Sequence, residues 1–315
     1  MNRSRLIFSR LPSKSVFATA LAAPLSAREI LEVAANSKLT FTATDADLFL
    51  RKLIRAGNVK KAGPHYAALT DRVISCLETT QDAATTRLLL TRFIELKCAN
   101  TFMRVLPFYC KRMDEGMTVG DHVTVIWGLA VLHPKGDHRA VLDELVRRLR
   151  GRAGEMSRWM VYRAVFSLAK LNYREGRELY EQLAPKIRER IQKEPYGAFT
   201  PKELVRIGWA YGWQKVRDVP LFADLSKAYQ QAIDELEYAE LKVLKQLYHA
   251  MHFRDKELLW KVDQQLQVLQ PLGPLNADFT PRRKPFKNKE QRVSMTDPLI
   301  RPLSKIKRRK LLGRK

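Results

Sequence analysis

The chain has few cysteines and no long apolar run. Only three cysteines occur in 315 residues, Cys76, Cys98 and Cys110, and none forms a C-x-x-C pair. Neither a disulfide framework nor a structural zinc site is therefore expected, and we interpret the cysteines as small apolar side chains in a reducing compartment. No stretch approaches the ~18 apolar residues of a transmembrane helix, so we expect no membrane insertion.

Motifs for catalysis and cofactor binding are also missing. His249 and His252 lie three residues apart, but no cysteine or carboxylate joins them in a known ligand pattern, and an H-E-x-x-H sequence is absent. The segment Gly151–Gly154 is a basic turn and not a phosphate-binding glycine loop. We predict no cofactor, no metal site and no enzymatic activity.

Acidic residues are scarce, most of all at the two ends of the chain. There are 57 Lys and Arg against 33 Asp and Glu, a formal net charge of +24. Residues 1–28 contain no acid and carry +5, and residues 281–315 carry +12, which leaves +7 for residues 29–280. A charge of this size indicates the partner, which is nucleic acid, an anionic membrane or an acidic protein.

The N-terminus has the composition of a targeting segment. Arginine, serine and apolar residues alternate from Arg3 to Arg10 without any acid, as in a mitochondrial or plastid transit peptide. Residues 17–23 resemble the short apolar core of a secretory signal, which is the rival interpretation. The spread arginines and the basic remainder favour organelle import, so we expect residues 1–25 to direct the chain to the mitochondrial matrix.

A short phrase recurs three times after an apolar helical stretch. It reads Tyr173-Arg174-Glu175, then Val216-Arg217-Asp218, then Phe253-Arg254-Asp255, and its arginines are 43 and 37 residues apart. Repeats of this length are helix–turn–helix units that stack into an α-solenoid. We interpret the acid as a cap for the second helix and the arginine as a partner for the carbonyl end of the first, with ligand contact as the alternative role of the arginines.

Apolar spacing predicts an all-α protein. About six helix pairs begin near residues 42, 81, 117, 156, 198 and 235, after a helix capped by Ser26, and no run of alternating strand pattern occurs. Thr200-Pro201-Lys202-Glu203 predicts a capping box at a helix start. We expect an α-solenoid over residues 26–270 and an extended, basic, proline-punctuated tail over residues 271–315.

Aromatic and basic side chains supply the candidate contacts to RNA. We expect Trp127, Phe166, Trp209, Tyr211 and Trp213 to pack between helices. The alternative is that some present a face for stacking on a base, and Trp213, near a helix end, is the best candidate for it. Basic residues on second helices and in the tail are candidates for phosphate contacts or, as the alternative, an ordinary charged surface. They are Arg147, Arg148, Arg150, Arg152, Lys186, Arg190, Arg282, Arg283, Lys284, Lys307, Arg308, Arg309 and Lys310.

One unit carries a family resemblance. Residues 199–211 read F-T-P-K-E-L-V-R-I-G-W-A-Y and precede the Val216-Arg217-Asp218 phrase. This resembles the octotricopeptide, FAST-kinase-like and RAP-associated helical repeats, which run F-S/T-P-x-E/D-L-x-x-x-x-W-A-F/Y-A/G before an apolar–Arg–Asp turn. Residues 161–183 are similar to the same unit and residues 126–132 to its first helix, so the resemblance covers about residues 117–262.

The resemblance implies an organelle-targeted α-solenoid that binds RNA. Members act in RNA processing, stability, editing or ribosome assembly, and many carry a C-terminal RAP domain, where this chain has its basic tail. We therefore predict a non-catalytic protein that binds mRNA, guide RNA or rRNA together with other proteins of a mitochondrial ribonucleoprotein. The alternative is a scaffold subunit that binds acidic proteins without touching RNA.

Overall fold

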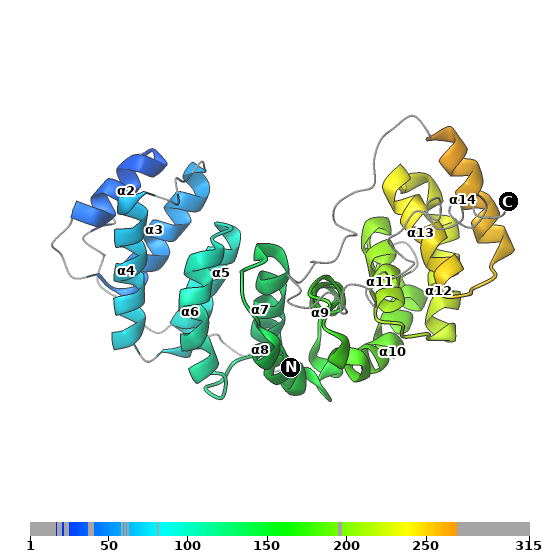
Figure 1. Ribbon diagram of the computed structural model, residues 1–315, viewed down its shortest axis with the longest axis horizontal. Helices are drawn as coiled ribbons and strands as arrows, with labels where there is room; N and C mark the ends of the chain where they lie inside the picture. Colours follow the sequence, from blue (N-terminus) through cyan, green and yellow to red (C-terminus); the bar gives the residue numbers. More distant parts are fainter. Residues whose placement is uncertain are drawn as a thin grey trace, which may run out of the picture. The chain divides into compact units, whose positions relative to one another are not determined.

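The computed structural model is built from α-helices (Figure 1). It describes residues 25–36, 41–57, 63–80, 82–194 and 197–269, with Phe17, Leu21, Val59 and Lys61. These residues form thirteen α-helices and three short 3-10 turns, and no strand occurs among them. The predicted all-α, repeat-like fold is confirmed, whereas its continuation as one solenoid stays a prediction. The predicted targeting segment and basic tail lie outside the described residues.

The helices follow one another as pairs, close to the predicted boundaries. An initial helix, α2 (Ala27–Asn36), precedes six pairs. The first helices are α3 (Ala43–Ala56), α5 (Ala83–Glu95), α7 (Val119–Leu132), α9 (Arg158–Lys170), α11 (Pro201–Trp213) and α13 (Tyr238–Ala250). The second helices are α4 (Pro64–Thr79), α6 (Ala99–Lys111), α8 (Arg139–Leu149), α10 (Arg177–Lys193), α12 (Val219–Gln231) and α14 (Lys256–Val268).

Polar residues begin these helices as the sequence predicts. The backbone N–H of Glu203 donates to the Thr200 hydroxyl at 3.3 Å, and the Thr200 N–H donates to the Glu203 carboxylate at 2.9 Å. Ser26 and Glu29 make the same reciprocal pair at the start of α2. Each pair satisfies two N–H groups that the helix itself leaves without a partner. The predicted capping box and the Ser26 cap are confirmed.

First helices end in a recurring left-handed corner. Lys97, His133, Asn172, Lys215 and His252 have φ between 46° and 58° and end α5, α7, α9, α11 and α13. After α11, the Lys215 N–H donates to the carbonyl of the residue three positions back at 3.1 Å, and the next N–H reaches five positions back at 3.0 Å. This pair of bonds is a Schellman motif, which satisfies carbonyls at a helix end. The corners are 36 to 43 residues apart, so they define the repeat length.

The recurring phrase lies directly after three of these corners. Asp218 and Asp255 each accept a hydrogen bond from a backbone N–H in the first turn of the second helix, at 2.8 Å and 2.9 Å. The predicted capping role of the acid is confirmed for these two copies. In the remaining copy Glu175 begins no helix and instead pairs with Arg139 at 3.0 Å. The Arg217 guanidinium lies 5.1 Å from the Phe253 ring centre, so it packs on the next copy of the phrase.

The helices form two compact units. One comprises residues 1–121 with 131–135, and the other comprises residues 122–130 with 136–315. In the second unit α9 packs against α11 and α11 against α13, while α10 packs against α12 and α12 against α14 (Figure 1). First helices therefore have first helices as neighbours, and second helices have second helices. In the first unit α3 packs against α5, and α4 against α6, in the same way.

The first helices of the second unit approach their neighbours closely. A Cβ atom added to Gly208 would overlap the Tyr229 hydroxyl, and one added to Gly212 would overlap a methyl group of Leu247. The space at Gly208 lets Tyr229, buried on α12, donate to the Leu204 carbonyl at 2.9 Å. A side chain at either position would displace the Tyr229 or Leu247 side chain, so glycine lets the neighbouring helices lie this close.

Candidate nucleic-acid interface

The candidate arginines of α8 are engaged with one carboxylate. Arg147 and Arg148 each lie 2.6 Å from Glu144, which precedes them by one helical turn. Their hydrogen bonds hold the pKa of Glu144 at about 2, well below its usual range, the bond from Arg147 being the stronger cause. The carboxylate is therefore charged at neutral pH and offsets part of the positive charge at this end of α8.

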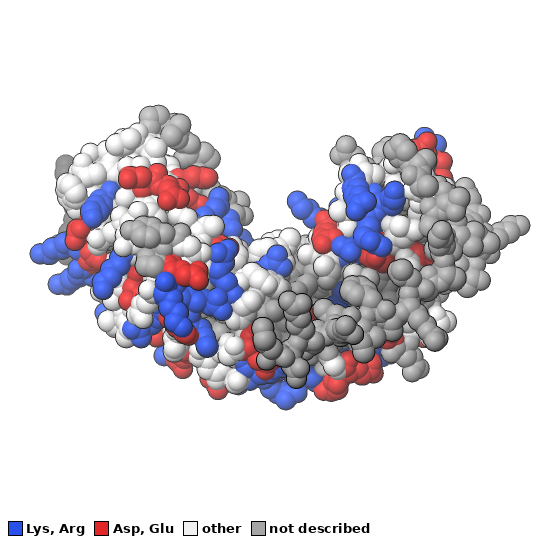
Figure 2. All heavy atoms as spheres, turned by 180° about the vertical axis from the view of Figure 1, so that it is seen from behind, with Lys and Arg blue, Asp and Glu red and all other residues white. Residues whose placement is uncertain are grey.

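The other candidate cations near the second helices are engaged as well. Arg150 lies 3.1 Å from Glu178, Arg152 lies 2.8 Å from Glu155, and Lys186 lies 3.6 Å from Glu189. Arg190 donates to the Met156 carbonyl at 3.2 Å. Exposed pairs of this kind add little stability, but each places a negative charge beside a positive one. Figure 2 accordingly shows basic and acidic residues interspersed on the visible face.

Trp213 lies in the interior. Only 4% of its surface is exposed, its ring stacks on Trp209 at a centroid distance of 5.9 Å, and its indole N–H donates to Asn172 at 3.2 Å. The prediction that Trp213 packs between helices is confirmed, and this burial leaves little of its ring surface for the alternative, stacking on a base. Both the ring and the N–H of Trp213 already have partners inside the protein.

The remaining candidates belong to the tail. These residues are Arg282, Arg283, Lys284, Lys307, Arg308, Arg309 and Lys310, and all of them lie outside the described residues. Their contact with RNA stays a prediction that rests on charge.

An aromatic row crosses the first helices of the second unit. Trp127, Phe166 and Trp209 each stand six residues before the left-handed corner of their own helix. Their ring centres are 6.5 Å apart between Trp127 and Phe166 and 5.8 Å apart between Phe166 and Trp209. The predicted packing of these aromatic residues between helices is confirmed. Rings from three successive repeats therefore contact one another in register.

Two rings of this row each have an arginine over them. The contact is the same in the two successive repeats. Arg163 of α9 lies 5.0 Å from the ring centre of Trp127, and Arg206 of α11 lies 5.2 Å from that of Phe166. Both arginines stand nine residues before their corner. Such geometry is a cation–π interaction, and it presents guanidinium groups between aromatic rings. Sequence reasoning missed both arginines, although their common distance from the corner was a usable signal.

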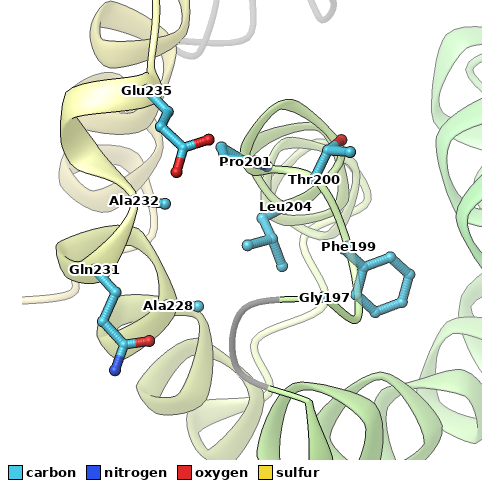
Figure 3. Close-up of a pocket in the computed structure, with 9 residues that line it drawn as sticks. All are labelled: Gly197, Phe199, Thr200, Pro201, Leu204, Ala228, Gln231, Ala232 and Glu235. Atoms are coloured by element: carbon cyan, nitrogen blue, oxygen red, sulfur yellow. The ribbon is translucent and has the colours of Figure 1, made fainter.

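A shallow pocket lies between the start of α11 and the end of α12 (Figure 3). It has a volume of about 240 Å³, and Leu204 points into it from α11. Glu235 is the one titratable side chain among its lining residues, and the Thr200 hydroxyl in its wall already caps α11. Acid–base catalysis usually needs a second group within reach of such a carboxylate, and this lining does not supply one.

The described residues form neither a metal-binding cluster nor a membrane-spanning helix. Over the described part of the chain, no three His, Cys, Asp or Glu side chains gather in a group suited to a metal ion. No helix in that part combines the length and apolar character needed to cross a bilayer. Burial raises the pKa of the Cys98 thiol above its ordinary value, which favours the inert thiol over the reactive thiolate.

No protein-family model matches the chain, and no curated protein is significantly similar to it. The family resemblance of residues 117–262 therefore remains an expectation from the sequence. The features that bear on function are therefore the helical fold and the arginines that lie over the aromatic row.

Proposed function

We propose that this chain is a non-catalytic, RNA-binding helical-repeat protein that acts within a ribonucleoprotein. The observation that carries the proposal is the repeated placement of Arg163 and Arg206 over aromatic rings of the preceding repeat. The guanidinium groups offer contacts to phosphate, and the exposed ring of Trp159, 4.8 Å from Arg163, offers a face for a base to stack on. The net charge of +24 supports the same class of partner.

The compartment and the complex belong to the proposal as well. The acid-free N-terminus and the resemblance of residues 199–218 support a mitochondrial matrix protein that acts in RNA editing, RNA processing or the assembly of the mitochondrial ribosome. Fusion of residues 1–25 to a reporter tests the location. The fusion enters mitochondria if the proposal is correct, and a reporter that is secreted or stays in the cytosol contradicts it.

Salt-dependent binding tests the function itself. The full chain without its targeting segment is titrated against a fluorescent single-stranded RNA, and the dissociation constant is measured at several salt concentrations. We expect the logarithm of affinity to fall with the logarithm of salt by about 0.7 for each phosphate contact. Absence of binding at low salt contradicts the proposal, and so does affinity that does not change with salt.

A second candidate is a scaffold that binds proteins without RNA. It is favoured by α14, where Trp260 is 62% exposed and Val268 is 72% exposed. Apolar side chains of this size on a surface are typical of contacts with another protein. Crosslinking in cells separates the two candidates, because direct crosslinks to RNA are expected only for the first.

A further inference from the structure

Arg163 is held between two indole rings. Its guanidinium carbon lies 5.0 Å from the ring centre of Trp127 on α7 and 4.8 Å from that of Trp159, one turn earlier on α9. A guanidinium group carries five N–H donors. Within the described residues the contacts of Arg163 are with these two rings, so its hydrogen-bond donors stay available for a ligand.

The charge of Arg163 has no carboxylate to balance it among the described residues. No ion pair joins it to an Asp or Glu there, in contrast to the arginines of α8, and burial lowers the pKa of its guanidinium below the ordinary value. A half-buried cation with unused donors is costly, and an anion that reaches those donors lowers the cost. The surroundings of Arg163 are thus suited to an anionic ligand.

Trp159 adds an exposed aromatic surface at the same place. It is 40% exposed, although large aromatic side chains are normally covered. An uncovered indole beside a cation offers a base a ring to stack on while its phosphate meets the cation.

We propose that Trp127, Trp159 and Arg163 form a binding site for one nucleotide of single-stranded RNA. Arg163 donates hydrogen bonds to a phosphate oxygen, Trp159 stacks on the adjacent base, and Trp127 holds Arg163 in position. Arg206, which also donates to the Tyr162 hydroxyl at 2.9 Å, is the equivalent residue one repeat later and marks the direction of the strand along the first helices. This inference rests on the proposed function, because it assigns a site to the RNA.

RNA fits this site better than an acidic peptide does. A carboxylate would satisfy Arg163 but would leave the exposed ring of Trp159 without a partner. A nucleotide brings both a negative charge and an aromatic face, and stacking on a base is tolerant of sequence because every base has such a face. We therefore expect little sequence preference from this site alone.

Two substitutions at the site test the proposal in the full chain without its targeting segment. W159A removes the stacking ring, and R163Q removes the charge while keeping a polar side chain. With a fluorescent oligouridylate as the probe, we expect binding to weaken by about tenfold to a hundredfold for W159A. For R163Q we expect a loss of about tenfold and a salt slope that is smaller by about 0.7, as for one lost phosphate contact.

Two matched variants are the controls. W260A removes another exposed indole of the same unit, and R177Q removes an exposed arginine that is already paired with Glu181. Both should bind the probe within about twofold of the unchanged chain, because exposed residues away from the site contribute little. The variant R163M tests whether the effect on affinity is independent of stability. It should bind RNA more weakly. Its melting temperature should be unchanged or higher, because the substitution removes a charge that no carboxylate balances.

The outcomes distinguish an error in the proposed site from an error in the proposed function. If the unchanged chain binds the probe and W159A and R163Q bind it equally well, the site is wrong and the proposed function stands. If the unchanged chain binds no RNA, both are wrong. If polyglutamate displaces the probe from the unchanged chain but not from R163Q, and W159A has no effect, the occupant is an acidic peptide. The inference is then overturned.

Discussion

First and second helices of the second unit differ in what their side chains do. Nine of the thirteen residues of α11 are buried, whereas α10 buries six of seventeen. The basic residues of the second helices pair with acids nearby, as Lys186 does with Glu189 and Arg188 with Asp224. Some basic residues of the first helices pair with acids as well, as Lys202 does with Glu240, but Arg163 and Arg206 lie over aromatic rings.

This difference between first and second helices shows that a count of basic residues does not locate a binding surface. α10 has five arginines and lysines, against three in α9 and two in α11, yet most of its charges are matched by neighbouring carboxylates. Arg163 stands out because its partners in the described structure are rings and not acids. The environment of each cation, more than the number of cations, decides which face of the repeats attracts an anion.

The largest expected effect tests the close packing of the first helices. G208A places a methyl group against the Tyr229 hydroxyl, and we expect the free energy of unfolding to fall by about 1–2 kcal/mol, because overpacking outweighs the better helix propensity of alanine. G154A is the control, since nothing lies within 4 Å of its added Cβ atom. Chemical denaturation measures both variants. Equal stability of G208A and the unchanged chain contradicts the packing described for α11 and α12.

The Tyr229 hydroxyl gives a sharper form of the same test. Y229F loses the hydrogen bond to the Leu204 carbonyl, which should lower the free energy of unfolding by about 0.5–1.5 kcal/mol. The double variant G208A/Y229F should lose less than the sum of the single variants, because the atom nearest the new methyl group is gone. Strict additivity in the double-mutant cycle would show that the two positions do not touch.

Capping of a second helix is the next effect in size. D218A removes the acceptor for the first turn of α12 and should lower the free energy of unfolding by about 1 kcal/mol. E175A changes the acid at the same place in another copy of the phrase, where Gly176 and not the acid is the N-cap of α10, and should cost less than about 0.5 kcal/mol. Thermal denaturation of the two variants compares them. A larger loss for E175A contradicts the assignment of the two acids.

The smallest effect concerns the paired charges of α8. E144Q removes the carboxylate that offsets Arg147 and Arg148, so RNA should bind about two- to fivefold more tightly at low salt and almost equally at high salt. Fluorescence anisotropy at two salt concentrations measures the change. Weaker binding by E144Q would mean that Glu144 positions these arginines for RNA and does not neutralise them.

Helix positions follow from the sequence because their signals are local. Apolar spacing and caps predicted starts near residues 198 and 235, and the structure begins α11 at Pro201 and α13 at Tyr238. Thr200 and Glu203 identify their capping box without reference to the rest of the fold. Periodicity and capping act within a few residues, so a single sequence contains them.

The candidate interface was harder to predict because it depends on contacts between repeats. Arg163 meets Trp127 across 36 positions of sequence, and only the left-handed corners show that these residues occupy related places on neighbouring helices. The place of Trp213 near a helix end makes it a candidate for stacking on a base, but its ring is covered by Trp209. Burial and ion pairing are properties of the packed molecule, which a pattern along one chain does not determine.

The most direct test of the account is to map where RNA touches the chain. Single-stranded RNA is crosslinked by ultraviolet light to the full chain without its targeting segment, and the modified peptides are identified by mass spectrometry. We expect a crosslinked peptide from α9 that contains Trp159, and we expect this crosslink to be missing in the W159A variant. Crosslinks confined to α8 and α10, with none on α9, would contradict the claim that the first helices bind the RNA.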